Sequence, residues 1–374
     1  MDFNLSEREK MIQSTAREFA VNEVLPRAAE IDRTAEFPHD VVGKMVKMGY
    51  FGLAYPAEYG GSGCGYVAYA LVIEQLARAS MTVAAIVAVS ILSEESLFRF
   101  GSEAQKRKHL VPLVQGDVLG CFCFTEPATG SDPKAVATRA RRDGGYYVIE
   151  GEKNFISMAA AASQALVFAK DDTGRVSSFI VPTAAAGFQV REPCETLGLR
   201  GFGACVVHLD SVRVPEENLV GEKGGGYEIM LEAISVERIG VASQAVGVAR
   251  AALDLSVEYA KQRIAYEKPI SRMPTIQWLL AEMASRIEAG RWLSYRGAFL
   301  RDQGQSIRHD SAMAKLFCSQ MAVEVTRMGM QVHGAYGTMK SLAMERLYRV
   351  AKMTEVYVGV SEIQRAIIAS QLIQ

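Results

Sequence analysis

The spacing of hydrophobic residues divides the chain into three blocks. In the first, apolar side chains recur every three or four positions, for example over residues 41–48 and 67–79. This period predicts amphipathic helices. Ser6 stands where its hydroxyl can cap the first of these helices. We therefore expect an N-terminal helical domain over residues 1–116.

The middle block, residues 117–222, consists of short runs of β-forming residues separated by turns rich in Gly, Asp and Pro. The runs cover residues 119–124, 146–150, 165–169, 177–181, 188–191 and 205–209. Several short strands at this spacing predict a β-barrel or sandwich rather than alternating βαβ units.

The third block, residues 223–374, returns to helical periodicity with few helix breakers. It contains four long runs, at residues 226–262, 274–302, 310–333 and 353–374. Four such runs predict a C-terminal four-helix bundle. The order helical, β, helical indicates an α+β multidomain fold and argues against a doubly wound sheet.

Composition narrows the range of partners. The 374 residues are 49% hydrophobic with a formal net charge of -1, and no long block carries one sign of charge. This balance argues against nucleic acid or an anionic membrane as a main partner. The polar N-terminus lacks the pattern of a signal peptide, and uncharged stretches such as residues 81–92 are too short to span a bilayer. We expect a cytoplasmic protein that does not bind membranes.

Motifs for other cofactors are absent or weak. The glycines of residues 221–226 lack the GxGxxG spacing and the surrounding βαβ unit of a dinucleotide site. Neither a Walker motif nor HExxH occurs in the sequence. The six cysteines are scattered, with a single CxC pair at Cys121 and Cys123, so no metal site is expected.

Five segments resemble signatures of the acyl-CoA dehydrogenase family. They are FTEPATGSD (residues 124–132), GEKNFIS (151–157), RIAYEKPI (263–270), QVHGAYG (331–337) and ERLYR (345–349). Each alone is modest evidence, but their order, their spacing and the order of the three blocks agree. The resemblance covers nearly the whole chain.

The resemblance implies FAD, bound noncovalently between the β domain and the bundle. Thr125 and Ser157 can form hydrogen bonds with ring heteroatoms, Phe155 can pack on a ring face, and Arg263 can pair with the pyrophosphate. The other cofactor-binding residues that it implies are Phe122, Phe124, Gly130, Ser131, Ile156, Tyr266, Ile270, Gln331, Val332, Gly334, Ala335, Ser361 and Glu362.

The family also implies an oligomer, because the segment that begins at Gln331 would reach the adenine end of FAD in a neighbouring subunit. We therefore expect a homotetramer, or at least a dimer. The chain departs from the family at Glu267, whose negative charge lies where the pyrophosphate should run.

A second departure concerns the catalytic base. Oxidation at the α and β carbons of a thioester needs a base for the α proton and an acceptor for the β hydride. Most of the family uses the Glu of a Glu-Gly-Thr triplet, which here reads Val358-Gly359-Val360. The isovaleryl-CoA, long-chain and prolyl-carrier-protein dehydrogenases instead place the base directly before an Arg on an earlier helix. Glu237, directly before Arg238, is similar to that arrangement.

The residues around Glu237 support this assignment independently. Its helical neighbours at three and four positions are all apolar or small, namely Ala233, Ile234, Gly240 and Val241. Residues 239–249 carry no charge, which predicts a buried helix. A carboxylate on that face should have a raised pKa, as a general base requires. A surface ion pair with Arg238 is disfavoured, since adjacent helical residues do not face each other.

Polarisation of the thioester carbonyl does not need the missing carboxylate. In the family, the carbonyl oxygen accepts a hydrogen bond from the backbone N–H at the Glu position, and Val358 keeps that N–H. We therefore count the Val358 N–H as catalytic by hypothesis. The resemblance implies contacts with the substrate at Ser131, Arg238 and Gly359.

Together these features predict an oxidoreductase that dehydrogenates an acyl thioester, most simply an acyl-CoA, with Glu237 as base. An electron-transferring flavoprotein would reoxidise the flavin. Three alternatives stay open: a carrier-protein thioester as substrate, a non-redox eliminating enzyme on the same scaffold, and a flavin-binding protein without catalysis.

Overall fold

A computed structural model describes residues 4–373 and places helices at both ends of the sequence around a single large sheet. The first helical part comprises α1 (Glu7–Phe19), α2 (Ala28–Thr34), α3 (His39–Lys47), α4 (Gly65–Ala79), α5 (Met81–Phe100), α6 (Glu103–Gln105) and α7 (Val111–Gln115). Short π and 3₁₀ segments join several of them, including Ala20–Val24, Leu25–Arg27, Tyr50–Gly52, Ala57–Tyr59 and Lys106–Leu110. The predicted cap at Ser6 is confirmed: its hydroxyl accepts a hydrogen bond from the Glu9 N–H at 3.3 Å.

Helix α5 extends beyond the uncharged stretch of residues 81–92, which alone is too short to span a bilayer. Its 20 residues are long and apolar enough to cross a membrane by length and composition, but 94% of the tested window is buried inside the protein. It therefore has the environment of a core helix. Helices α4 and α5 both pack against α8 (Gly226–Gln262).

The middle part forms an eight-stranded sheet. Its strands are β1 (Gly120–Cys123), β2 (Arg139–Asp143), β3 (Tyr146–Ile156), β4 (Gln164–Lys170), β5 (Val176–Pro182), β6 (Phe188–Pro193), β7 (Cys205–Pro215) and β8 (Leu219–Val220). The order is β6-β7-β3-β2-β4-β5-β8, and β1 pairs with β4 in parallel. Six strands match the predicted runs. The sheet does not close into a barrel, so the barrel form of the prediction is wrong.

Strand β2 was not predicted, because its sequence Arg-Ala-Arg-Arg-Asp has almost no apolar alternation. Only Ala140 is buried, and the strand forms through backbone pairing with β3, Arg139 opposite Glu150 and Asp143 opposite Tyr146. A strand with one buried side chain gives little signal in the hydrophobic pattern.

The C-terminal part contains α8, α9 (Pro274–Asp302), α10 (Arg308–His333), α11 (Ala343–Thr354) and α12 (Ser361–Leu372). A small hairpin, β9 (Ile264–Ala265) with β10 (Lys268–Pro269), joins α8 to α9. Three of the four predicted helices are confirmed. The fourth, residues 353–374, is wrong, because a turn at Val358 and Gly359, both with positive φ, separates α11 from α12. Residue 374 lies outside the described residues.

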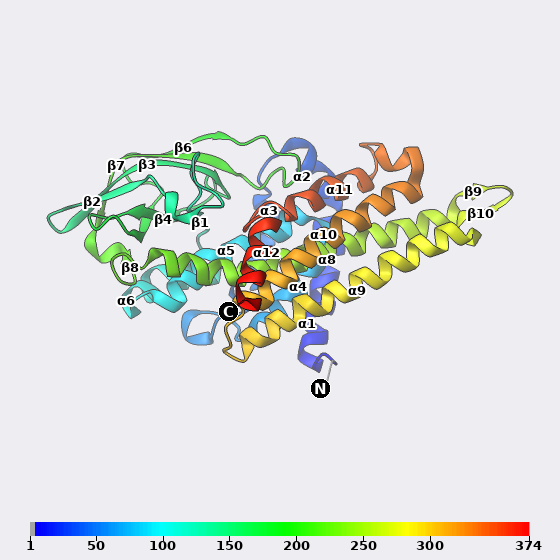
Figure 1. Cartoon of the computed structure of the whole chain (residues 1–374), viewed down its shortest axis with the longest axis horizontal. Coiled ribbons are helices and arrows are strands. Elements are labelled where there is room, and N and C mark those ends of the chain that lie inside the picture. The colour runs from blue at the N-terminus through cyan, green and yellow to red at the C-terminus, as the bar shows by residue number, and fades with distance from the viewer. Residues whose placement is uncertain (1–3, 374) are drawn as a thin grey trace.

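One hydrophobic core runs through both helical parts, and the sheet has a second core of its own. Ile86 of α5 and Ile239 of α8 belong to the first core, and Val167 and Phe179 to the second. Figure 1 shows the sheet at one end of the molecule and the β9–β10 hairpin at the opposite end, with α8 running between them.

Candidate active site

Glu237 lies in the first half of α8 and is 0% exposed. Its Oε2 accepts a hydrogen bond from the Tyr69 hydroxyl of α4 at 3.3 Å. Its Oε1 has no hydrogen-bond partner among the described residues. The side chain is therefore buried as the uncharged residues around it predicted, with one oxygen free to accept a proton.

Burial determines the protonation behaviour of Glu237. Removal from water raises the pKa of the Glu237 carboxyl well above the usual 4.5. The hydrogen bond from Tyr69 acts in the opposite direction, and the nearby Glu94 carboxyl raises the pKa further. A carboxylate that holds a proton this tightly is a strong base once it is ionised.

The turn that replaces the usual Glu-Gly-Thr lies against the same part of α8. The Tyr357 hydroxyl donates to Gln244 Oε1 at 2.6 Å, and Glu237 helps to raise the pKa of Tyr357, which burial already raises. The structure thus brings Glu237 and the segment around Val358 together, although they are far apart in the sequence.

Val358 has φ of 56°, which is rare for a β-branched residue. Its N–H donates no hydrogen bond to another described residue, while its carbonyl accepts one from Gln364 Nε2 at 3.3 Å. The N–H that the oxyanion hypothesis uses is therefore available.

A buried lysine holds this turn. Lys315 of α10 is 0% exposed, and its Nζ donates to the Gly359 carbonyl at 2.7 Å. Burial, together with the nearby Arg238 charge, lowers the pKa of Lys315 to about 7. Arg238 is also buried, and burial together with Arg308 lowers its pKa to about 10. Sequence reasoning missed Lys315, because a single lysine on a helix gives no sign of burial.

Replacing Lys315 with methionine should loosen the turn at Val358. The variant keeps most of the side-chain volume but removes the hydrogen bond to Gly359, and such bonds from charged donors contribute about 1.5–3 kcal/mol. We expect a lower melting temperature and a kcat/KM about tenfold lower, an order of magnitude that corresponds to about 1.4 kcal/mol. The control is Lys352→Met, since Lys352 is exposed and its ammonium pairs with Glu355 at 2.5 Å. Equal activity of the Lys315 variant and the control would contradict this role.

The residues predicted to face the flavin ring gather near the C-terminal ends of β1 and β3. The Asn154 N–H donates to the Thr125 carbonyl at 2.8 Å, so the loop after β1 lies along the end of β3. Phe155 has φ of 55° and is 59% exposed, which presents an aromatic ring at the surface. Ile156 is buried and Ser157 half-buried, whereas Gly130 and Ser131 are exposed in the loop that follows.

Phe122 and Phe124 anchor the start of the same loop. Both rings pack against Phe168, with centroids 4.7 and 5.5 Å away. Beneath them the Lys153 ammonium contacts Glu126 Oε1 at 2.7 Å and the Phe168 carbonyl at 2.6 Å, and both charged side chains are buried. This ion pair joins the loop to β3.

The residues predicted for the pyrophosphate and adenine form a second group around the β9–β10 hairpin. Arg263 lies over the Tyr336 ring at 6.0 Å, and Ile270 packs with Val332 in a small cluster. Tyr266, at the tip of the hairpin, is 89% exposed. A cavity of about 420 Å³ nearby is lined by Arg327, Met330, Gln331, Gly334, Ala335, Thr338 and Tyr348.

Within one chain, then, most of the predicted cofactor residues form two separate groups, and Ser361 and Glu362 lie outside both at the start of α12 (Figure 1). One group is at the sheet and the other at the hairpin end. Ser361 and Glu362 begin α12 directly after the turn at Val358; the Ser361 hydroxyl is buried without a partner among the described residues, and Glu362 is exposed. An exposed aromatic ring and an unpaired buried hydroxyl fit a flavin, which offers a ring face and hydrogen-bonding atoms.

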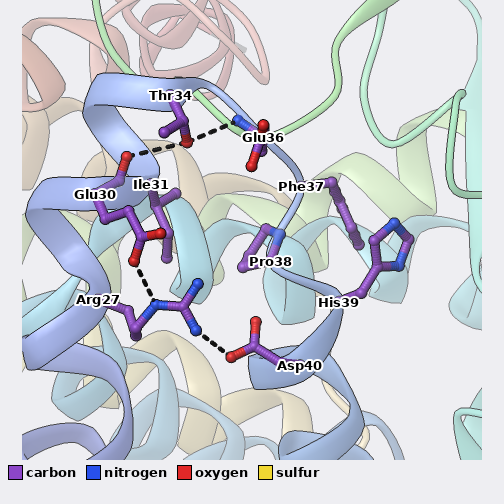
Figure 2. A pocket seen from close by; sticks show the side chains of 9 residues that line it. All are labelled: Arg27, Glu30, Ile31, Thr34, Glu36, Phe37, Pro38, His39 and Asp40. Atoms are coloured by element: carbon purple, nitrogen blue, oxygen red, sulfur yellow. Dashed lines mark hydrogen bonds and ion pairs between the residues drawn. The ribbon is translucent and has the colours of Figure 1, made fainter.

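A further pocket, of about 290 Å³, lies between α2 and α3 (Figure 2). In its lining, Arg27 forms ion pairs with both Glu30 and Asp40. Sequence analysis did not single out these residues, and the pocket holds none of the predicted site residues.

Comparison with known proteins gives the same family in each part of the chain. Residues 6–117 match the acyl-CoA dehydrogenase N-terminal domain, residues 121–212 the middle domain and residues 224–373 the C-terminal domain. The chain is 39% identical over 380 residues to the probable acyl-CoA dehydrogenase YngJ of Bacillus subtilis, covering 100% of both. It is 38% identical to the acryloyl-CoA reductase (NADH) of Anaerotignum propionicum, covering 100% of this chain and 96% of that one.

The fold agrees closely as well. The butyryl-CoA dehydrogenase of Megasphaera elsdenii superposes with a TM-score of 0.98 at 34% identity, covering 100% of both chains. The chain therefore belongs to the acyl-CoA dehydrogenase family. It is a flavoprotein oxidoreductase that acts on CH–CH bonds, with FAD as its cofactor.

Proposed function

We propose that this enzyme dehydrogenates an acyl thioester at its α and β carbons with Glu237 as the base. The single observation that carries this proposal is the buried Glu237 carboxyl, with one oxygen unpaired, beside the turn that contains Val358. When bound, FAD supplies the acceptor for the β hydride. Glu237 takes the α proton, and the Val358 N–H donates to the thioester oxygen, where negative charge develops.

The positions of the cofactor residues support an assembly of at least two chains. A single FAD molecule that contacted both groups within one chain would have to run from the sheet to the opposite end. A second copy that brings its hairpin end to the sheet of the first would complete the site instead. We propose a homotetramer or dimer on this basis, with Gln331 and its neighbours serving the adjacent subunit.

We take acyl-CoA as the substrate, an electron-transferring flavoprotein as the electron acceptor and the cytoplasm as the location. Higher identity favours CoA thioesters: the acryloyl-CoA reductase and the butyryl-CoA dehydrogenase are 38% and 34% identical to this chain, whereas the prolyl acyl carrier protein oxidase AnaB is 26% identical. A panel of short acyl-CoA and matching acyl-carrier-protein thioesters, mixed anaerobically with the holoenzyme, tests this choice. Bleaching of the flavin by CoA forms supports the proposal. Bleaching by carrier-protein forms alone would identify the other carrier, and product formation without bleaching would indicate elimination.

The raised pKa of Glu237 predicts the pH dependence of catalysis. The base acts only when ionised, so kcat/KM should fall as the pH drops through a pKa well above 4.5. The same pKa shift affects stability in the opposite direction from activity. Burial favours the protonated carboxyl, so the folded state gains stability from this shift at low pH. That contribution is lost as the pH rises through the pKa of Glu237 in the folded state. A pH profile of kcat/KM with its acid limb near 4.5 would contradict the assignment.

A further inference from the structure

The Tyr69 hydroxyl lies between two acceptors and has one proton to donate. It is 3.3 Å from Glu237 Oε2 of α8 and 3.3 Å from the Ala88 carbonyl oxygen of α5. Tyr69 is 3% exposed and Glu237 is 0% exposed, so these contacts lie inside the interface of α4, α5 and α8. Because a phenol carries a single proton, a full hydrogen bond to one acceptor excludes a full hydrogen bond to the other.

The strength of one acceptor depends on protonation, and that of the other does not. The Ala88 carbonyl is neutral at every pH, whereas the Glu237 carboxyl is negative when ionised and neutral when it holds a proton. Hydrogen bonds to a charged acceptor are roughly twice as strong as those between neutral groups. Tyr69 should therefore donate to Glu237 while the carboxyl is ionised, and the Ala88 carbonyl should compete for the hydroxyl once Glu237 is protonated.

Tyr69 has the opposite effect on Glu237 from its other neighbours. Burial raises the pKa of Glu237 most, the hydrogen bond from Tyr69 lowers it, and Glu94 of α5 raises it. Tyr357, in the turn before α12, also interacts with Glu237, and burial raises its own pKa well above 10.0, which keeps it neutral. Among residues 4–373, Tyr69 is therefore the group that favours the ionised form of the base.

The cations on α8 and α10 do not take over this role. Arg238 follows Glu237 directly, but adjacent residues of a helix do not face each other. Arg238 interacts instead with Arg308 and Lys315, and none of these three cations affects the pKa of Glu237. The ionised carboxylate thus depends on a hydrogen bond rather than on an ion pair.

Gly240, three residues after Glu237 on α8, leaves room for this hydrogen bond. A Cβ at residue 240 would overlap the Tyr69 hydroxyl and lie 3.0 Å from Glu237 Oε2 and 3.4 Å from the Ala88 Cβ. A side chain at this position would therefore displace the hydroxyl from the carboxylate.

A second buried tyrosine of α4 makes the same kind of bond under different conditions. The Tyr66 hydroxyl donates to Glu95 Oε2 at 2.7 Å, and Glu95 also forms an ion pair with Arg301. The Arg301 charge balances that carboxylate whether or not the tyrosine is present. The Tyr66–Glu95 pair is therefore a natural control for the Tyr69–Glu237 pair.

We propose that Tyr69 is the positioning residue of the base: it donates to Glu237 Oε2 while Glu237 is ionised, leaves Oε1 free for the α proton, and turns to the Ala88 carbonyl once Glu237 is protonated. This inference rests on the proposed function, in which Glu237 is the base. Tyr69 keeps its own proton throughout, and only the direction of its O–H bond changes. Its effect is to keep the buried carboxyl ionised at a lower pH than burial alone would allow.

The test is Tyr69→Phe, which removes the hydroxyl and keeps the ring. The pH profile of kcat/KM, which reports the pKa of the base in the free enzyme, is measured with a thioester that the parent holoenzyme oxidises. We expect the acid limb to move to higher pH by about one to two pH units, the range for a hydrogen bond to a charged group. At a pH below both limbs, kcat/KM should be about tenfold to a hundredfold lower. Well above both limbs, it should reach at least the parent value.

Three further variants locate the effect. Tyr66→Phe, the matched control on the same helix, should lower the melting temperature but leave the acid limb in place. Gly240→Ala should move the limb in the same direction as Tyr69→Phe. Combining Gly240→Ala with Tyr69→Phe should recover melting temperature, because phenylalanine has no hydroxyl for the new Cβ to meet, while the limb stays at the higher pH.

Infrared spectra provide a readout that does not depend on activity. The band of the protonated Glu237 carboxyl is the one lost in Glu237→Gln, and its titration should move to higher pH in Tyr69→Phe. An unchanged titration and an unchanged acid limb in Tyr69→Phe would overturn the inference and leave Glu237 as the base. An equal displacement of the limb by Tyr66→Phe would also overturn it. A displaced titration in a protein whose Glu237→Gln variant is fully active would support the effect of Tyr69 on Glu237 and contradict the proposed function.

Discussion

Replacing Glu237 with glutamine is expected to lower kcat/KM by about 10²–10⁴-fold, the contribution typical of a positioned general base. Glutamine keeps the size of the side chain and can still accept the hydrogen bond from Tyr69, but it cannot take a proton. The measurement is the rate of anaerobic flavin bleaching by a thioester that the parent enzyme oxidises. FAD content and melting temperature, measured in parallel, separate lost chemistry from lost folding.

Glu228→Gln provides the matched control for this prediction. Glu228 lies on the same helix, but it is exposed and distant from the buried face that carries Glu237. The control should keep full activity. A Glu237 variant as active as the parent would exclude Glu237 as the base. In that case the buried Glu94 would be the next carboxyl to test.

A carboxylate introduced at the family's usual position offers a second check on the base. In the double variant Glu237→Gln with Val358→Glu, the new carboxyl stands where most of the family has its base. Partial recovery of bleaching over the single variant would show that the turn faces the same substrate atom as Glu237. The positive φ of Val358 would also suit a residue without β-branching better.

The second large effect is expected on stability, from Lys153→Met. The Lys153–Glu126 pair is buried, with side chains 0% and 3% exposed. Glu126 also accepts hydrogen bonds from the Ala137 and Thr138 N–H groups, at 2.6 and 3.1 Å. Removing the lysine leaves an uncompensated buried carboxylate, which costs about 3–5 kcal/mol. Calorimetry of the holoenzyme should show a markedly lower melting temperature.

Two further variants show whether the effect comes from the unpaired charge. Lys153→Met combined with Glu126→Gln should recover part of the loss, because no charge then stays buried. Arg142→Met breaks the exposed Arg142–Glu216 pair at 2.9 Å, and such surface pairs contribute at most about 1 kcal/mol. If Lys153→Met were no more harmful than Arg142→Met, the buried pair would have no special role in the sheet.

The order of the three blocks and most of their helices and strands could be predicted from the sequence. The spacing of hydrophobic residues and the composition both change sharply where one block meets the next. Residues that gave no periodic signal were missed. Strand β2 is charged and depends on its neighbours, and the break at Val358 and Gly359 comes from backbone conformation within an apolar run. The candidate base could be selected, because Glu237 directly precedes Arg238 as in the relatives it resembles and its helical neighbours at three and four positions are apolar or small. Lys315, Tyr69 and Glu94 were missed because tertiary packing, not local sequence, buries them.

Helix α8 has a mechanical consequence for any assembly. Its 37 residues correspond to about 55 Å of continuous helix. It carries Glu237 in its first half and ends at Gln262, directly before Arg263. This single helix therefore sets the separation between the catalytic region and the hairpin end of each chain. Neighbouring copies would have to contact each other in a way that fits this fixed separation. Inserting or deleting one residue in α8 would rotate and shift one end of the helix relative to the other. Such a change would displace the hairpin end relative to Glu237 and so disturb both catalysis and assembly.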